Sequence, residues 1–599
     1  MLAIRLACFG KSTNPDFLAV DQSVAFGEAD EVATRPVAKP FAVDPLTPET
    51  FVGMVTPYFN DDRVSKLFRA LLEANAEGVE LQQNLNDYLD QSGSKYGGEP
   101  AWKFGSRQAT YGELVATASN AAGALVSAGI ERGDRAAFLL KNCPEIIEMH
   151  AGMSRAGAIA VPLNFRSVAR ELAHVVNDSD SRVVVFGEEF TDAMNEVRGS
   201  VAPDIRYVMV GSSDAPRWST PYLEWLDSGA GKARLKTEIN PEHPYFIGYT
   251  SGTTGVPKGA VISHRALIRH ALTLMLEYGG PSEPRDRFLS LMPMFHSNGT
   301  WFATAAMMAG ALNVIHPSGG FDPREVLRVV AADRITHTSV VPTMLRMIVS
   351  ADPDDLALLD TSSLASILVG SAPITLSLKR EAERVLGAKV NEGYGATETG
   401  VVTSLRPGDP DDKHASVGRP TIGREVSIRD DHGRDCPIGT AGEIWTRGEG
   451  VLLDHYWNNP EASRAAFDGS GWCTVGDMGY LDADGYLFMT DRKHDMIISG
   501  GENVYPTEVE SVLLDHPAVS EAAVVGMAHE HWGETVRAVV VLKPGQVVTP
   551  EDLIEFCRVG LADFKVPRSV RFLGELPKSS TGKILRRLVR DAASTNEDK

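Results

Sequence analysis

The sequence predicts an α/β protein with a large N-terminal domain of βαβ-type sheets and a small C-terminal α+β domain. Three observations lead to this fold class. The chain has 599 residues, which is enough for more than one domain. From Asn84 onward, short apolar stretches typical of strands alternate with helical patterns, as in βαβ units. After about Asp491 the pattern changes to that of a small unit of mixed strands and helices.

We therefore divide the chain into three parts. Residues 1–83 form an N-terminal extension, in which Val64–Leu81 has the pattern of an amphipathic helix. Residues 84–491 form the large domain, and residues 492–599 form the small one. The elements predicted from the pattern are, in chain order, helix Tyr111–Ala128, strand Arg135–Leu140, helix Ile146–Ala156, strand Arg182–Phe186, strand Pro244–Tyr249, strand Ser366–Val369, helix Leu376–Leu386, a strand starting at Lys389–Asn391, strands Ala522–Gly526 and Val536–Leu542, helix Glu551–Val559 and strand Val570–Phe572.

Composition and charge exclude several classes of protein. The net charge of −21 argues against nucleic acid as a main partner, because phosphate backbones need a basic face. Five scattered cysteines without a CxxC pair fit a reduced, cytoplasmic protein rather than a disulfide or zinc scaffold. The longest apolar stretch, Thr300–Ile315, is too short to span a membrane and is interpreted as a buried helix running into a strand. Peripheral contact with the inner membrane face through the first eighty residues stays open, and so does the oligomeric state.

A segment rich in glycine, threonine and serine follows the predicted strand Pro244–Tyr249. It reads Thr250-Ser251-Gly252-Thr253-Thr254-Gly255-Val256-Pro257-Lys258-Gly259. Glycines let backbone N–H groups turn toward an anion, the hydroxyls add donors, and Lys258 adds a positive charge. The segment lacks the Gly-Lys-Ser/Thr triplet of a Walker A loop. It therefore predicts a different kind of phosphate-binding loop.

One βαβ unit carries two further glycine-bearing segments. The strand Ser366–Val369 ends in Gly370-Ser371-Ala372-Pro373, and the strand after the next helix ends in Glu392-Gly393-Tyr394-Gly395. Open α/β sheets bind ligands at the carboxyl ends of their strands. We therefore expect two ligand-binding turns side by side at this edge of the sheet.

These motifs resemble those of the adenylate-forming superfamily, which includes acyl-CoA synthetases, peptide-synthetase adenylation domains and luciferases. The resemblance runs from roughly Asn84 to Arg590 and is closest to the bacterial fatty-acyl-CoA synthetases. It implies that a carboxylic acid and ATP form an acyl-adenylate and pyrophosphate, and that the thiol of coenzyme A then takes the acyl group and releases AMP.

The resemblance also implies a role for each motif. The segment after Tyr249 would hold the outer phosphates of ATP, Asp477 the ribose hydroxyls, and Glu398 the Mg²⁺ ion. The residues implied to bind nucleotide or coenzyme A are Thr250, Ser251, Gly252, Thr253, Thr254, Gly255, Lys258, Gly370, Ser371, Ala372, Pro373, Glu392, Gly393, Tyr394, Gly395, Asp477, Arg492, Gly500 and Gly501. The family usually has Thr-Gly-Asp before the ribose acid, whereas this chain has Val475 at the Thr position.

The residues implied to act in catalysis are Lys583, His296, Glu398 and Thr397. His296 belongs to the octet Met292–Gly299, which lies beside the acyl pocket in the family, and Lys583 to the C-terminal motif Leu576–Ile584. Lys583 would contact the attacking carboxylate and the α-phosphate. The small domain would be mobile and would rotate about Lys493–His494, so that Gly500 and Gly501 form the channel for the thiol.

The sequence leaves the acid and the acceptor open. Small residues at Ala303–Ala306 and Gly370–Ala372 permit a deep apolar pocket, which favours a medium- or long-chain fatty acid. An aryl or alicyclic acid, or a carrier-protein thiol in place of coenzyme A, are the alternatives, and a catalytically silent nucleotide sensor is a third. The absence of HExxH and GxSxG motifs disfavours a protease or a serine esterase.

Overall fold

The structure is a computed structural model. It describes residues 84–212, 214–232, 239–251, 257–318, 320–352, 356, 358–372, 374–448, 451–492, 495, 497–499, 502–504, 506–529, 533–561, 563–578 and 584–594. The predicted N-terminal extension, including its helix Val64–Leu81, lies outside these residues. None of the described helices is both long enough and apolar enough to cross a membrane.

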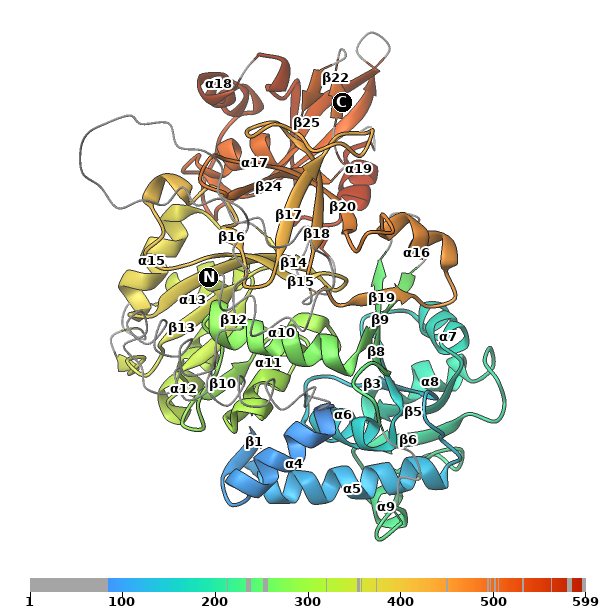
Figure 1. Ribbon diagram of the computed structural model, residues 1–599. Coiled ribbons are helices and arrows are strands. Elements are labelled where there is room, and N and C mark those ends of the chain that lie inside the picture. Colours follow the sequence, from blue (N-terminus) through green and yellow to red (C-terminus); the bar gives the residue numbers. More distant parts are fainter. Residues whose placement is uncertain are drawn as a thin grey trace, which may run out of the picture. The chain divides into compact units, whose positions relative to one another are not determined.

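The first large sheet has nine strands (Figure 1). In spatial order they are β16 (Arg419–Pro420), β15 (Gly400–Leu405), β14 (Lys389–Ala396), β13 (Ser366–Val369), β12 (His337–Val340), β10 (Arg287–Ser290), β11 (Leu312–Ile315), β1 (Pro100–Phe104) and β2 (Arg107–Thr110). The strands from β14 to β1 pair in parallel, and the two edges pair antiparallel. The carboxyl ends of six neighbouring strands therefore lie at one edge of the sheet.

The second large sheet has eight strands. In spatial order they are β19 (Leu453–Tyr456), β9 (Pro257–Ser263), β8 (Pro244–Ser251), β4 (Ile159–Pro162), β3 (Arg135–Leu139), β5 (Ser181–Gly187), β6 (Arg206–Val210) and β7 (Thr220–Pro221). The strands from β8 to β7 are parallel, whereas β9 is antiparallel to both of its neighbours, β8 and β19. Strand β19 thus brings a late part of the chain back to the β8–β9 hairpin.

Helices form a layer between the two sheets and cover their outer faces. The inner layer contains α4 (Leu85–Tyr96), α5 (Tyr111–Ser127), α6 (Pro144–Ala156), α10 (His264–Glu277) and α11 (Ser297–Ala309). The outer helices are α12 (Pro323–Asp333), α13 (Pro342–Val349) and α15 (Leu376–Leu386) on the first sheet, and α7 (Ala169–Asp178) and α8 (Thr191–Val197) on the second. The short α9 (Tyr222–Ser228) packs beside α5. Figure 1 shows α10 and α11 between strands of the two sheets.

Alternation within β3 illustrates why both faces of these sheets are covered. Ala136 and Phe138 pack against the inner helices, whereas Ala137 and Leu139 pack against the outer ones. All four side chains are fully buried. A strand buried on both faces is apolar throughout, as is typical of parallel sheets.

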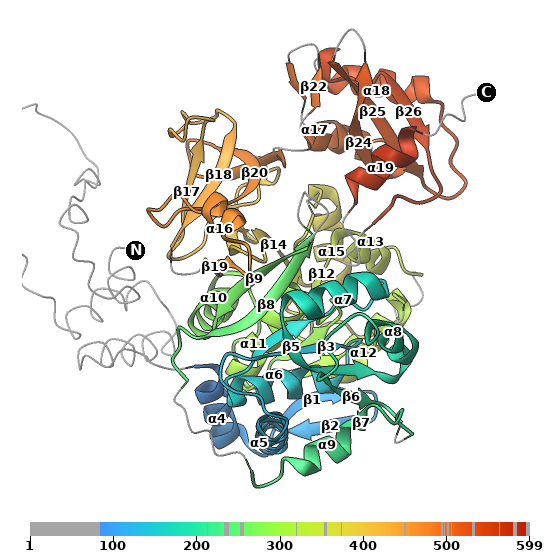
Figure 2. The ribbon, with the colours of Figure 1, turned by 90° about the vertical axis from the view of Figure 1, so that its right-hand side faces the viewer.

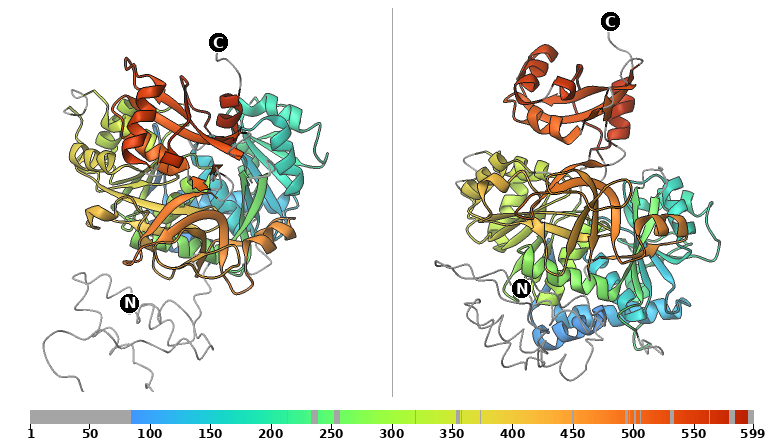
Figure 3. Two further views of the ribbon diagram at one scale, coloured as in Figure 1. Left: turned by 90° about the horizontal axis from the view of Figure 1, so that it is seen from above. Right: turned by 45° about the horizontal axis from the view of Figure 1, so that its top comes forward.

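The remaining described elements form two smaller sheets. The first contains β17 (Glu425–Arg429), β18 (Gly442–Arg447), β20 (Cys473–Leu481) and β21 (Leu487–Arg492), and α16 (Pro460–Ala466) precedes β20. The C-terminal sheet contains β22 (Ile497–Ser499), β23 (Glu502–Val504), β24 (Val519–His529), β25 (Gly533–Leu542) and β26 (Ser569–Phe572). Its helices are α17 (Pro506–Leu514) and α18 (Pro550–Gly560) on one face and α19 (Arg586–Ser594) on the other (Figures 2 and 3).

The predicted α/β fold class is confirmed, and most predicted elements agree with the structure within one to three residues. The strand Ser366–Val369 and the helix Leu376–Leu386 have the predicted bounds. Local signals explain this agreement. Thr110 and Glu113 form a capping box that starts α5, and Pro144 starts α6, which ends at Gly157 with φ +67°.

One prediction about the second turn is wrong. Glu392–Gly395 was expected to be a turn after a short strand, but β14 continues through Ala396. The extension pairs antiparallel with β15, and the register shifts between Tyr394 and Gly395. A Cβ atom on Gly395 would lie 2.1 Å from the carbonyl oxygen of Gly400. Glycine is therefore needed for close approach between the strands, rather than to end β14.

A buried carboxylate in α6, that of Glu148, makes the stability of the folded protein depend on pH. Glu148 is 7% exposed and accepts a hydrogen bond of 2.9 Å from the hydroxyl of Tyr222. Burial, and next the nearby Glu145 carboxylate, raise the pKa of Glu148 to about 7. The folded state therefore binds more protons than the unfolded state between about pH 4.5 and pH 7. Stability from this group is present at low pH and is lost as the pH rises through this window.

We predict that Glu148→Gln flattens the pH dependence of stability. The amide oxygen still accepts from Tyr222 but does not titrate, so the variant gains stability relative to the wild type, by about 3 kcal/mol at most, as the pH rises from 5 to 8. Urea denaturation at several pH values measures this difference. Glu131→Gln, at an exposed carboxylate, is the control and should keep the wild-type profile. Parallel profiles for wild type and Glu148→Gln would contradict the assignment.

Candidate active site

The predicted phosphate-binding segment is a β-hairpin rather than an isolated loop. Figure 2 shows β8 and β9 side by side. Thr250 and Ser251 end β8, and Lys258 lies opposite Thr250 on β9. The connecting residues, which include the predicted Gly252, Thr253, Thr254 and Gly255, lie outside the described residues. The two strands therefore fix Thr250 and Lys258 next to each other at one end of the hairpin.

Glu398 is a buried acid beside this hairpin. Its Oε1 atom accepts hydrogen bonds of 3.0 Å each from the hydroxyls of Thr250 and Tyr456. Glu398 is 7% exposed, and the Nζ atom of Lys258 lies 5.7 Å from the centroid of the Tyr456 ring. Burial and the Glu398 carboxylate raise the pKa of Tyr456, so that its hydroxyl stays a donor at neutral pH. Two strands that are distant in sequence, β8 and β19, thus supply the donors to one carboxylate.

These groups fit a Mg²⁺ ion that is bound together with polyphosphate. The described residues contain no group of three or more His, Cys, Asp or Glu side chains that could hold a metal. Mg²⁺ commonly uses one or two carboxylates together with phosphate oxygens and water, so it does not need such a group. Glu398 supplies a hard oxygen ligand, and Lys258 adds positive charge nearby for phosphate.

Thr397, which precedes Glu398, contacts the histidine octet. The hydroxyls of Ser297 and Thr397 lie 3.0 Å apart, and Ser297 Oγ lies 3.4 Å from His296 Nδ1. His296 also caps α11, where its Nδ1 accepts from the N–H of Asn298 at 3.4 Å. The structure therefore brings together His296, Thr397 and Glu398, which the sequence analysis assigned to catalysis.

Tyr394 and Asp477 are also brought together. The Tyr394 hydroxyl donates a hydrogen bond of 2.8 Å to Oδ2 of Asp477, which lies on β20 and is 7% exposed. The backbone of Arg492 pairs with that of Asp477 in neighbouring β21. At the Val475 position, where the family usually has threonine, the adjacent Thr474 accepts from the N–H of Gly476 at 3.1 Å. Thr474 therefore supplies a hydroxyl that holds the backbone of β20 at this site.

Tyr278 packs beneath the two glycine-bearing segments. Its hydroxyl donates to the carbonyl of Val369, and a Cβ atom on Gly393 would lie 2.7 Å from its ring. Val369 lies opposite Glu392 in the β13–β14 register, so both segments are side by side as predicted. Ser371 has φ +69° and is exposed, as is Ala372. This edge of the sheet presents a strained backbone turn to a ligand.

Glu392 has a different position from the one implied by the resemblance. It is 3% exposed, and its Oε1 accepts from the N–H of Ile374 at 3.4 Å. Burial raises the pKa of Glu392, and the neighbouring Lys379 opposes this shift. Glu392 therefore lies under the Gly370–Ala372 turn and supports it, rather than presenting its carboxylate to a ligand.

Other predicted site residues cannot be assigned from the structure. Pro373, Gly500, Gly501 and Lys583 lie outside the described residues, and so do Lys493 and His494 of the proposed hinge. Only the backbone of Arg492 is described. Their roles remain predictions.

Tyr456 and Tyr278 are two further residues of the site that no sequence motif indicated. Tyr456 lies 58 residues after Glu398, and Tyr278 lies 91 residues before Val369, which accepts its hydroxyl. Each acts through one long-range contact, and a single long-range contact produces no periodic pattern. The sequence offers only an aromatic residue in β19 and another after α10. Such residues are as typical of a protein core as of a functional site.

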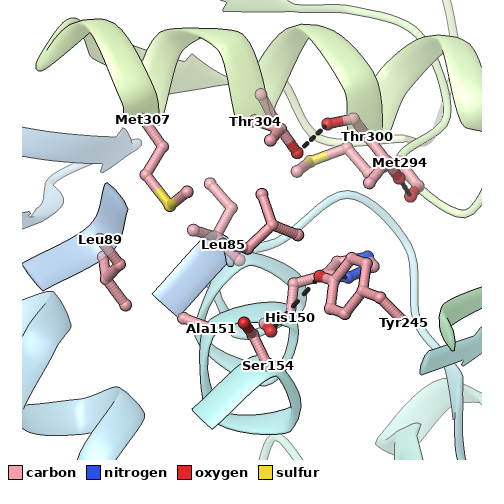
Figure 4. Close-up of a pocket in the computed structure, with 12 residues that line it drawn as sticks. Leu85, Leu89, His150, Ala151, Ser154, Tyr245, Met294, Thr300, Thr304 and Met307 are labelled. Carbon is pink, nitrogen blue, oxygen red and sulfur yellow. Dashed lines mark hydrogen bonds between the residues drawn. The ribbon is translucent and has the colours of Figure 1, made fainter. Parts of the chain in front are cut away.

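A mostly apolar cavity lies behind the first turns of α11 (Figure 4). Its walls come from α4, α6, β8 and α11, and include Leu85, Leu89, Ala151, Met294, Ala303 and Met307. His150 Nδ1 lies 2.6 Å from the Tyr245 hydroxyl, and burial lowers the pKa of His150 to about 3. The cavity volume of about 40 Å³ suits a few water molecules. Of the predicted small pocket residues, Ala303 lines this cavity.

Two family models match the chain. The model described as "AMP-binding enzyme" matches residues 89–457, and "AMP-binding enzyme C-terminal domain" matches residues 508–583. The chain is 35% identical over 506 residues to the long-chain-fatty-acid–CoA ligase FadD13 of Mycobacterium tuberculosis, covering 82% of this chain and 94% of the relative. It is also 35% identical to the fatty acid–[acyl-carrier-protein] ligase ScoC of Streptomyces coeruleorubidus, over 82% and 93% of the two chains.

Solved structures match the fold as well. The anthranilate CoA ligase AuaEII in complex with anthranoyl-AMP superimposes with a TM-score of 0.79 at 28% identity. The match covers 86% of this chain and 98% of that protein. Sequence and structure relatives thus cover both large sheets and the C-terminal unit.

We predict that Tyr456→Phe weakens binding of ATP in the presence of Mg²⁺. Loss of a hydrogen bond to a buried carboxylate should cost about 1–1.4 kcal/mol, or about five- to tenfold in Kd. Calorimetry with Mg²⁺, and again with EDTA, measures the effect. Tyr486→Phe is the matched control, since that hydroxyl donates at 2.9 Å to Asp409 away from Glu398. An equal loss in EDTA, or in the control, would show that Tyr456 does not act through the metal ligand.

Proposed function

Because this chain belongs to the AMP-binding, adenylate-forming enzyme family, we propose that it activates a medium- or long-chain fatty acid with ATP and transfers the acyl group to coenzyme A. The chain is an AMP-forming acid–thiol ligase whose substrates include ATP and coenzyme A and whose cofactor is Mg²⁺. The observation that carries the proposal is the buried Glu398 carboxylate between Thr250 and Tyr456. It joins the phosphate-binding hairpin to a ligand for Mg²⁺.

In the first half-reaction, a carboxylate oxygen of the acid attacks the α-phosphorus of ATP. The new P–O bond forms as the bond to the β-phosphate breaks, and pyrophosphate leaves. The protein mainly positions the reactants and neutralises charge. Tyr394 and Asp477 would hold adenine and ribose, the Thr250–Lys258 hairpin would hold the outer phosphates, and Lys583 would contact the attacking carboxylate. Mg²⁺, held by Glu398, would neutralise charge on the phosphates.

In the second half-reaction, the thiol of coenzyme A attacks the carbonyl carbon of the acyl-adenylate. A thioester bond forms, the bond from the carbonyl carbon to AMP breaks, and the thiol proton goes to solvent. We assign residues 84–491 to the large domain and residues 492–599 to the mobile small domain. The hinge would be Lys493–His494, and Gly500 and Gly501 would line the thiol channel. Hinged closure of this kind lets one site serve two steps.

The preference for a fatty acid is supported by the relatives, which include long-chain-fatty-acid–CoA ligases. FadD13 is named as acting on long-chain fatty acids, AuaEII on anthranilate, and ScoC on an acyl-carrier-protein acceptor. An aryl or alicyclic acid, or a carrier-protein acceptor, therefore stays as an alternative. A cytoplasmic location is also proposed, with peripheral membrane contact left open.

A panel of acids distinguishes these substrates. Pyrophosphate release is measured with fatty acids of two to eighteen carbons, with benzoate and anthranilate, and with cyclohexane carboxylate. AMP release with free coenzyme A is then compared with release with an acyl carrier protein. The highest kcat/KM with a fatty acid of eight or more carbons and free coenzyme A is expected, whereas preference for an aryl acid or for the carrier would replace the proposal. Background turnover with every acid would indicate a nucleotide sensor.

We predict that Lys583→Ala lowers acyl-adenylate formation by roughly 10²- to 10³-fold, since it removes a charge from the reacting phosphate. Conversion of supplied acyl-adenylate and coenzyme A to thioester should change little. ATP–pyrophosphate exchange and thioester formation measure the two steps separately. Lys578→Ala, five residues earlier, is the control, because Lys578 is paired with Glu521 at 2.6 Å. Equal loss of both half-reactions would refute the role of Lys583.

We predict that His494→Pro slows thioester formation more than adenylation. Proline fixes φ, so it should hinder rotation of the small domain between the two steps. The same pair of assays measures the ratio of the two rates. His494→Ala removes the imidazole but leaves the backbone free to rotate, and it should keep that ratio. A parallel fall of pyrophosphate exchange and thioester formation in the proline variant would count against the hinge.

A further inference from the structure

Asn142 makes two hydrogen bonds to the backbone of the histidine octet. It lies in the loop between β3 and α6 and is 2% exposed. Its Nδ2 donates to the carbonyl of Met292 at 3.0 Å, and its Oδ1 accepts from the N–H of Met294 at 2.8 Å. A primary amide offers a donor and an acceptor side by side, so it matches both backbone groups at once.

The two partners come from different sheets. Asn142 follows β3 of the eight-stranded sheet, whereas Met292–His296 follows β10 of the nine-stranded sheet. A second contact joins the same segments. The ring of Phe165, which follows β4, packs edge-on against Phe295 with centroids 5.1 Å apart. Side chains at the end of one sheet therefore hold the segment that carries His296 at the end of the other.

The segment held by Asn142 leads directly into the site. The Thr300 hydroxyl donates at 2.7 Å to the carbonyl of Met294, and the N–H of Thr300 donates to the carbonyl of His296. The hydroxyl of Ser297, the residue after His296, lies 3.0 Å from the hydroxyl of Thr397. A shift of Met294 would therefore move His296 and Ser297 relative to Thr397. The Tyr394–Asp477 and Thr250–Glu398 contacts involve no atom of the octet.

We propose that Asn142 is a positioning residue that sets His296 and Ser297 against Thr397 for the reaction of the acid. This inference rests on the proposed function, in which the octet lies beside the acid. Asn142 acts through the backbone of Met292 and Met294. Its removal leaves a buried N–H and a buried carbonyl without their partner, so the segment must move or admit water. Displacement by about 1 Å can cost about 10²-fold in rate.

A double-mutant cycle with Asn142→Ala and His296→Ala tests this role. Alone, Asn142→Ala should lower kcat/KM for the acid in pyrophosphate exchange by about ten- to 10²-fold, while KM for ATP changes less than twofold. In the His296→Ala background the same substitution should change kcat/KM by less than threefold, because residues that act together are not additive. The proposal would be overturned if the losses in kcat/KM of the two single variants multiplied in the double variant. It would also be overturned if Asn142→Ala raised KM for ATP by the same factor by which it lowered kcat/KM for the acid.

Two further variants separate positioning from general stability. Asn142→Asp keeps an acceptor for the N–H of Met294, but it can donate to the Met292 carbonyl only when its carboxyl group is protonated. Its loss in kcat/KM should therefore be smaller than that of Asn142→Ala at low pH and should grow as the pH rises. This variant also serves if Asn142→Ala does not fold. Asn313→Ala is the matched control, since Asn313 is a buried amide on β11 that accepts from Ser290 at 2.7 Å. Asn313→Ala should lower the melting temperature, and its effect on kcat/KM for the acid should multiply with that of His296→Ala.

The outcomes distinguish the two proposals. A wild type that turns over none of the acids refutes the proposed function. If the wild type is active but Asn142→Ala and Asn313→Ala give the same result in the cycle, only the positioning role of Asn142 is refuted.

Discussion

A buried carboxylate must be matched by donors, and this requirement organises the candidate site. Glu398 is almost fully buried, and an unpaired charge in such a position would be costly. Thr250 at the end of β8 and Tyr456 at the end of β19 meet this requirement. Because these strands are fixed by their pairing with β9, the acid, the hairpin and the lysine on β9 are held in one arrangement before any ligand binds. Preorganised groups of this kind need little rearrangement during reaction.

The same logic explains the shape of the two glycine-bearing segments. Tyr278 fills the space beneath Gly393, and only a residue without a Cβ atom allows the backbone to approach its ring so closely. Glu392, which the motif suggested as a ligand-binding residue, is buried below the turn instead. A signature motif thus includes residues that shape the backbone, such as Gly393 and Glu392, as well as residues that face a ligand.

Much of the fold could be predicted from the sequence because its signals are local. Helix α15 and strand β13 have clear periodicity and defined ends, and their bounds were correct. The extension of β14 could not be predicted, since it depends on pairing with β15 across a turn. Thr250 and Ser251 were expected in a loop, but pairing with β9 makes them part of a strand. Tertiary pairing overrides local preference in both cases.

The residues of the candidate site also fall into those that the sequence predicted and those that it did not. His296, Thr397, Glu398, Tyr394 and Asp477 were named from motifs, and the structure places them in three hydrogen-bonded groups, which contain Ser297–Thr397, Thr250–Glu398 and Tyr394–Asp477. Asn142 and Tyr456 were not found. Their contacts span 152 and 58 residues, and an asparagine or a tyrosine alone gives no indication of a partner so far away.

The return of β19 to β9 also affects how the protein is made. Ala260 pairs with Tyr456, so the hairpin acquires its third strand only after nearly two hundred further residues have been synthesised. Contacts between distant parts of a chain form slowly, because the intervening loop must first be closed. The first half of the chain can therefore emerge from the ribosome and begin to pack its parallel strands, while the candidate centre around Glu398 is completed only after β19 has been synthesised. A truncated product ending before β19 would lack this centre even if its larger sheets formed.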